Sequence, residues 1–84
     1  MEYVGERISV MAAFFTEGKK FKPLKFKWST RVISVENITY SWTDRIGHDK
    51  IYHFSVTDGR TFYELSFNSG SLLWFLEKVD TEVY

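Results

Sequence analysis

Apolar and polar residues alternate along most of the chain, and β-branched and aromatic side chains fill the apolar positions. Alternation with a period of two is typical of β-strands, whereas an amphipathic helix repeats every 3.6 residues. We therefore predict an all-β protein with about six or seven short strands. The alternating segments are Arg7 to Thr16, Phe21 to Trp28, Arg31 to Glu36, Ile38 to Thr43, Ile51 to Thr57, Thr61 to Phe67 and Leu72 to Val79.

The alternation changes phase at Pro23, inside the second of these segments. The apolar residue before the proline is Phe21, and the apolar residues after it are Leu24, Phe26 and Trp28. Because proline has no N–H to donate to a ladder, we expect Pro23 at a bulge or at a sheet edge. A second change of phase, at Glu36 and Asn37, is expected to leave three side chains facing inward: Ile38, Tyr40 and Trp42.

Turn-forming residues separate the segments. Residues Glu17 to Lys19 predict a turn around a central glycine, and the polar stretch from Asp44 to Asp49 predicts the tip of a hairpin. Asp58-Gly59 is a two-residue hairpin signal, because both residues tolerate a positive φ. Ser71 could cap a helix, but the run from Leu72 to Val79 is short and apolar on all sides, so we favour a strand over a one-turn helix.

Short strands, tight turns and bends predict a small antiparallel barrel of the SH3-like or oligonucleotide-binding (OB-like) kind, with a β-sandwich as the alternative. The chain has 84 residues, too few for two cores, so we expect residues 1–84 to form one domain. The absence of cysteine excludes a disulfide framework and favours a cytoplasmic protein. No run is long enough for a membrane span, so we expect no membrane partner.

Basic and acidic side chains balance at 11 each, which excludes the overall positive field of a typical nucleic-acid-binding protein. The charges are unevenly placed, however, because the segment from Lys19 to Arg31 holds six of the basic residues and no acidic one. We identify five candidate residues for binding a phosphate backbone or a protein partner: Lys20, Lys22, Lys25, Lys27 and Arg31. Three rings could stack bases beside them: Tyr3, Phe21 and Phe62.

The same lysines have a simpler interpretation, since lysines on a solvated edge strand discourage aggregation of sheets. The uneven charge would also suit self-association, with an exposed sheet edge and aromatic residues forming a homodimer interface. A nucleic-acid or protein binding module is therefore the leading hypothesis, and a structural or self-associating domain is the alternative.

Catalytic and metal chemistry have little support in the sequence. His48 and His53 with Asp44 and Asp49 are residue types that bind zinc or iron, but their spacing matches no known ligand pattern. Glu64 is expected to be a cross-strand partner for a lysine or arginine. No glycine-rich phosphate loop or serine elbow occurs, so we expect a non-enzymatic protein without cofactor or metal.

Several short patterns together carry a resemblance: Ile8-x-Val10-x-Ala12-x-Phe14, Pro23-Leu24-Lys25-Phe26-Lys27-Trp28, Asp58-Gly59, Phe62-x-Glu64-Leu65-x-Phe67 and Trp74-x-Leu76. In this succession the chain resembles a group of short bacterial proteins catalogued as a domain of unknown function. The resemblance spans nearly the whole chain. It implies a small all-β protein of the bacterial cytoplasm and brings no established activity with it.

Overall fold

The structure, a computed structural model, describes residues 2–16 and 20–80. Within these residues there are seven strands and no helix. The strands are β1 (Glu2–Phe15), β2 (Lys20–Trp28), β3 (Arg31–Ser34), β4 (Asn37–Ile46), β5 (Asp49–Thr57), β6 (Phe62–Asn68) and β7 (Leu73–Asp80). All neighbours are antiparallel, in the order β3-β2-β1-β7-β6-β5-β4. The all-β prediction is confirmed, while the turn predicted at Glu17 to Lys19 lies outside the described residues.

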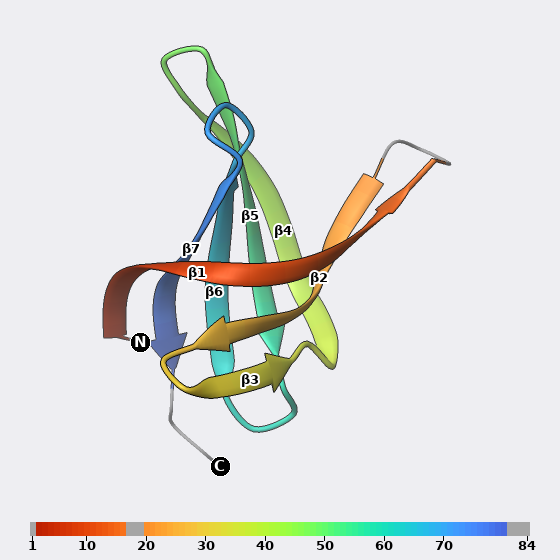
Figure 1. The fold of residues 1–84 in the computed structure, drawn as a ribbon, viewed down its shortest axis with the longest axis vertical. Helices are drawn as coiled ribbons and strands as arrows, with labels where there is room; N and C mark the ends of the chain where they lie inside the picture. Colours follow the sequence, from red (N-terminus) through yellow and green to blue (C-terminus); the bar gives the residue numbers. More distant parts are fainter. Residues whose placement is uncertain (1, 17–19, 81–84) are drawn as a thin grey trace.

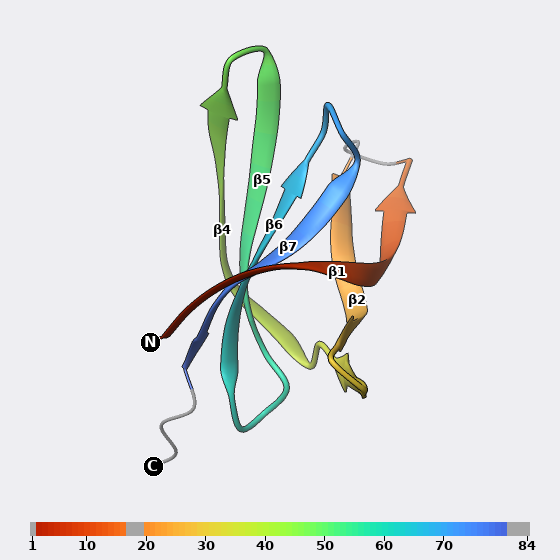
Figure 2. The ribbon, with the colours of Figure 1, turned by 60° about the vertical axis from the view of Figure 1, so that its left-hand side comes forward.

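The long strand β1 belongs to two parts of the sheet. Its first half pairs with β7, from Glu2 opposite Val79 to Ile8 opposite Trp74. Its second half pairs with β2, ending at Phe15 opposite Lys20. Figures 1 and 2 show the result: β1, β2 and β3 run across the direction of β5, β6 and β7, so the single sheet folds over itself into two layers.

The core lies between these layers and is made mostly by the inward faces of β5, β6 and β7. The other layer contributes Phe26 and Ile33, and Phe26 is only 1% exposed. Its ring meets the ring of Tyr63 edge-on, with the centroids 5.1 Å apart. Phe21 also faces inward, where its ring contacts Tyr52, Phe54, Phe67 and Trp74. Large rings therefore join the two layers, as expected for a small chain without disulfides.

The described sheet has two edge strands, β3 and β4, and is not closed into a barrel. Only Val35 and Glu36 separate these two strands in the chain. The N–H of Val35 donates to the Leu24 carbonyl at 2.8 Å, and the N–H of Glu36 donates to the Thr57 carbonyl at 2.9 Å. The β3–β4 connection is therefore hydrogen-bonded to β2 in one layer and to β5 in the other. No helix that could cross a membrane occurs in residues 2–16 and 20–80.

Two of the predicted loops differ from the observed ones. The polar stretch from Asp44 to Asp49 is mostly strand, and only Gly47 and His48 lie between β4 and β5. Conversely, the loop at Asp58-Gly59 spans residues 58–61, because one oxygen of Asp58 accepts hydrogen bonds from the N–H groups of Arg60 and Thr61. Charged residues can thus extend an exposed strand, and one carboxylate can hold a four-residue turn.

The prediction that Tyr40 and Trp42 face inward with Ile38 is wrong. The pairing with β5 shifts between Ile38 and Tyr40, which makes Thr39 an extra residue and reverses the faces that follow. The Thr39 hydroxyl donates to the Ser55 carbonyl at 3.1 Å, Tyr40 is exposed and Trp42 is partly exposed.

The strand predicted for the last segment is confirmed as β7, which begins at Leu73. The residues before it form a turn instead of a capped helix. In this turn the side-chain oxygen of Asn68 accepts hydrogen bonds from the N–H groups of Gly70 and Ser71. The Asn68 side chain therefore holds a turn at this point, and Ser71 caps no helix.

Candidate nucleic-acid interface

A one-residue bulge in β2 brings the lysines onto a single face. Ala12 of β1 pairs with Pro23 and the preceding Met11 pairs with Lys25, so Leu24 is the extra residue. The change of phase predicted at Pro23 is therefore confirmed as a bulge. Side chains alternate between the faces of a strand, so an uninterrupted β2 would place Lys22 and Lys25 on opposite faces.

The cross-strand pairs define this face. Residues directly opposite each other share a face, and the partners of the lysines on β1 are Phe15 for Lys20, Ala13 for Lys22, Met11 for Lys25 and Ser9 for Lys27. On β3, Val32 and Ser34 are the partners of Lys27 and Lys25. We call this the lysine face: Ser9, Met11, Ala13, Phe15, Lys20, Lys22, Lys25, Lys27, Val32 and Ser34. All four lysines are exposed, and none of these described residues is acidic.

Apolar side chains lie between the lysines of this face. Met11, Phe15 and Val32 are 55%, 47% and 63% exposed. The ammonium nitrogen of Lys22 lies 5.5 Å from the centroid of the Phe15 ring, within the range of a cation–π contact. The lysine face therefore combines positive charge with an accessible ring.

Phe15 was not among the rings predicted to stack bases. Of those rings, Phe21 faces inward and packs, partly buried, against the core. Tyr3 and Phe62 are exposed at pairs with Lys78 and Asp80, away from β2. The signal for Phe15 was present, because it shares the spacing of Met11 and Ala13 on the first strand. That Phe15 lies beside the lysines can be recognised only once the pairing of β1 with β2 is known.

Arg31 is not on the lysine face. It pairs with Trp28, whose side chain points to the opposite face from Lys27. Its charge acts near Tyr63, where burial and the Asp58 carboxylate raise the pKa of the phenol and Arg31 opposes that rise. Arg31 therefore lies on the opposite face of the sheet from the four lysines.

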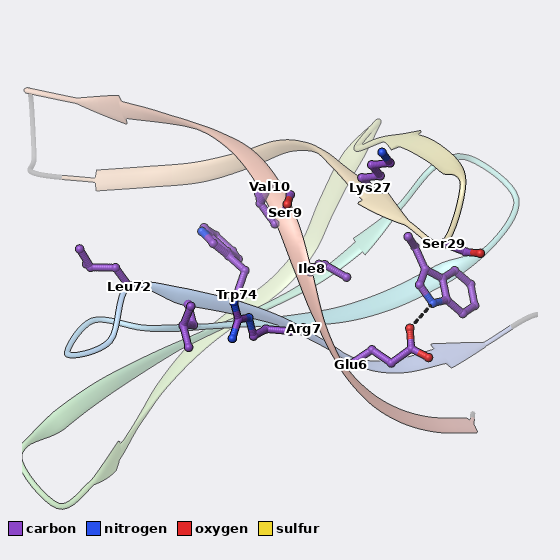
Figure 3. A pocket seen from close by; sticks show the side chains of 11 residues that line it. Glu6, Arg7, Ile8, Ser9, Val10, Lys27, Ser29, Leu72 and Trp74 are labelled. Atoms are coloured by element: carbon purple, nitrogen blue, oxygen red, sulfur yellow. Dashed lines mark hydrogen bonds between the residues drawn. The ribbon is translucent and has the colours of Figure 1, made fainter.

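Arg7 provides a basic side chain that was not predicted. It precedes Ser9 by two residues on β1, with no register shift between them, and so extends the lysine face toward β7. Arg7 and Lys27 both line a groove of about 520 Å³ that is shown in Figure 3. In the same groove the indole N–H of Trp28 donates to the Glu6 carboxylate at 2.9 Å. The basic surface therefore continues into a concave region beside an aromatic side chain.

The residues weighed for metal or catalytic chemistry lie apart from this face. His48 is at the β4–β5 turn, and the ring of His53 stacks on Trp42 with the centroids 4.8 Å apart. Among the residues that the structure describes, no group of three or more potential metal ligands comes together. Glu64 lies 4.0 Å from the ammonium nitrogen of Lys78, which confirms the cross-strand partner predicted for it.

The fold and this face define a small antiparallel β protein with one basic, partly apolar sheet surface. No protein-family model, curated protein or solved structure matches the chain. Its function is therefore inferred from the surface itself.

Proposed function

We propose that this protein is a non-enzymatic nucleic-acid-binding module that binds the phosphate backbone on its lysine face. The observation that carries the proposal is the bulge at Leu24, which puts Lys20, Lys22, Lys25 and Lys27 on one side of the sheet. Lys20 and Lys22 are two residues apart, as are Lys25 and Lys27. At a rise of roughly 3.3 Å per residue, the two lysines of each pair lie about 7 Å apart along the strand. Such a row can follow a phosphate backbone and release its counterions.

Protection of a sheet edge explains these lysines less well. Lys25 and Lys27 lie between β1 and β3, with ladder partners on both sides, and so they protect no edge. Lys20 and Lys22 precede the stretch that pairs with β3 and could serve that purpose. Edge protection thus explains only two of the four lysines, whereas phosphate binding explains all four.

The apolar side chains on this face support an additional role in contacting bases. Aromatic and apolar groups beside lysines let bases stack while their phosphates are neutralised. Phe15 and Met11 are placed for that contact, directly opposite Lys20 and Lys25. The proposal includes an SH3-like or OB-like arrangement, which is supported by the short Val35–Glu36 connection between the two edge strands.

The proposal predicts salt-dependent binding of an oligonucleotide. If four phosphates are contacted in a single strand, affinity should fall about 50-fold between about 50 and 200 mM salt. Fluorescence anisotropy with labelled single-stranded and duplex DNA and RNA would measure this and identify the preferred form. The double variant Lys25→Glu, Lys27→Glu should lose binding at both salt concentrations.

The matched control is Lys50→Glu, Arg60→Glu, which makes the same change in formal charge outside the lysine face. These two exposed residues lie at the start of β5 and in the β5–β6 loop. The control should weaken binding only slightly through the net charge. Equal losses in the two double variants, or an affinity that salt leaves unchanged, would remove the proposal.

A further inference from the structure

Strand β4 is at an edge of the sheet and pairs only with β5 among the described residues. The backbone groups on its other side have no ladder partner there. The strand is ten residues long, whereas the other edge strand, β3, has only four. Two large apolar side chains on it, Tyr40 and Ile46, are 66% and 68% exposed. Natural edge strands are usually short or protected by charged side chains, proline or a bulge. The stretch from Tyr40 to Ile46 has no lysine or proline, and its charged side chains are the adjacent Asp44 and Arg45.

The direction of the free backbone groups on β4 can be deduced from its turn. Only Gly47 and His48 join β4 to β5, and a two-residue hairpin closes on a hydrogen-bonded pair, here Ile46 with Asp49. Backbone groups alternate along a strand, so those of Arg45 and Thr43 point away from β5. Consistent with this, the N–H of Arg45 donates to the Asp44 side chain at 2.8 Å.

The space beside this edge is open. A groove of about 370 Å³ is lined by Lys20 and Phe21 of β2, by residues 41–43 of β4 and by residues 52–54 of β5. In Figure 2, β4 lies on the outside of its layer, and the tip of its hairpin with β5 reaches beyond the other strands. A further strand could therefore approach the middle of β4.

We infer that this edge pairs with β4 of a second copy of the chain, in an antiparallel register with the two-fold axis at Thr43. The register follows from the strand itself. The regular part of β4 runs from Tyr40, just after the bulge, to Ile46, just before the turn, and Thr43 is its midpoint. With this axis, every residue from Tyr40 to Ile46 is paired with a residue of the other copy.

The pairs formed in this register are complementary. Tyr40 of each copy meets Ile46 of the other, so the two most exposed apolar side chains of the strand cover each other. Thr43 meets itself, and such threonine pairs are favourable across strands. Moving the axis to Asp44 would place two carboxylates opposite each other, and moving it to Trp42 would bring Ile46 against the bulge. A symmetric interface of this kind is the commonest way in which identical chains associate.

The chain has no cysteine, so single cysteines can test the register directly. In a hydrogen-bonded antiparallel pair the Cα atoms are about 5.5 Å apart, which a disulfide can bridge. Under mild oxidation Thr43→Cys should form a disulfide-linked dimer. Ser41→Cys alone should not, but a mixture of Ser41→Cys with Arg45→Cys should form the mixed dimer.

Sedimentation of the unmodified chain over a range of concentrations provides a second measurement. It should reveal a reversible dimer whose dissociation constant rises at least tenfold in Ile46→Lys, while circular dichroism remains unchanged. A monomer at all concentrations, or equal cross-linking of Thr43→Cys and Ser41→Cys, would overturn the inference. Binding of an acidic or apolar peptide to β4 of a monomer would also overturn it. Lys20 belongs to the lysine face and also lines the groove beside β4, but Lys25 and Lys27 do not line it. The Lys25→Glu, Lys27→Glu variant and the β4 variants therefore test the two proposals separately.

Discussion

Asp58 holds the turn between β5 and β6 through one of its carboxylate oxygens. That oxygen accepts hydrogen bonds from the N–H groups of Arg60 and Thr61 at 3.0 and 2.8 Å. Burial by itself would raise the pKa of this carboxyl, but the hydrogen bonds that it accepts outweigh burial and lower the pKa below 3.8. The charged form of Asp58 is therefore more favourable in the folded chain than in the unfolded chain.

This lowered pKa predicts how stability depends on pH. A carboxyl whose pKa is lowered on folding stabilises the protein above its unfolded pKa, about 4, and that contribution is lost as the pH falls through the folded value. Asp58→Asn keeps the accepting oxygen without the charge. The stability difference between wild type and Asp58→Asn, measured by urea unfolding, should therefore shrink from pH 7 to pH 3.

Asp58→Ala is the companion variant, because it removes the acceptor as well as the charge. We expect it to lower the free energy of unfolding at neutral pH by about 1–2 kcal/mol, more than Asp58→Asn. If the difference between wild type and Asp58→Asn stayed constant over this pH range, the charge of Asp58 would have no part in holding the turn.

At the scale of single residues, the structure brings four of the five candidate residues together. Lys20, Lys22, Lys25 and Lys27 share a face as expected, but Arg31 does not. The face of Arg31 depends on the length of the β2–β3 turn, which the pattern of apolar residues leaves undetermined. Arg7 was missed for a related reason, since its position beside the lysines depends on the pairing of β1 with β2.

Among the elements, the β4–β5 hairpin depends on a glycine conformation. Gly47 has a φ of +61°, which suits the first position of a type II′ turn. A Cβ atom added at this position would meet nothing within 4 Å. Any cost of a side chain here would therefore come from the backbone conformation and not from a clash.

Gly47→Ala should accordingly destabilise the protein by about 1–2 kcal/mol, the cost of a left-handed conformation for a residue with a Cβ. For a domain of this size that cost lowers the melting temperature by roughly 4–8 °C per kcal/mol. His48→Ala, at the exposed neighbouring position, is the control and should change the melting temperature little. Equal melting temperatures for wild type and Gly47→Ala would contradict the turn described here.

Of the two bulges that affect the candidate surfaces, one was predictable from the sequence and the other was not. At Pro23 the alternation visibly changes phase, and proline is itself a bulge signal. At Thr39 the apolar residues Ile38, Tyr40 and Trp42 continue the alternation without a break. An edge strand tolerates the outward aromatic residues that result, so nothing in the local pattern reveals the change of face.

In the whole molecule, aromatic side chains of β2 pack the smaller layer against the larger one. Phe26 is the fully buried aromatic residue that β2 contributes to the core, and it packs on Tyr63. Phe26→Ala should lower the free energy of unfolding by about 3–5 kcal/mol, through lost burial and the cavity that remains. That is a large part of the roughly 4–12 kcal/mol expected for a chain of this length.

Val32→Ala is the matched control for this variant, because Val32 lies on the neighbouring strand β3 with its side chain exposed on the lysine face. Its effect on stability, measured by denaturant unfolding, should stay within about 0.5 kcal/mol. Similar losses for the two variants would mean that β2 does not anchor its layer through Phe26.

The order of the strands could not be predicted from the sequence. The alternation indicates which side chains share a face of one strand, but it carries no information on which strands are neighbours. Most neighbours in this sheet are also consecutive in the chain, and the exception is the pairing of β1 with β7. That pairing joins residues such as Glu2 and Val79, at opposite ends of the chain.

This one long-range pairing has a kinetic consequence. The strands β1 to β3 form one meander and β4 to β7 another, and each can close through short loops. Joining them requires the first half of β1 to find β7, and closing so long a loop is slow relative to hairpin formation. During synthesis the first half of β1 therefore has no partner strand until β7 has been made. The apolar side chains of β1 stay exposed until then, and such side chains favour premature association.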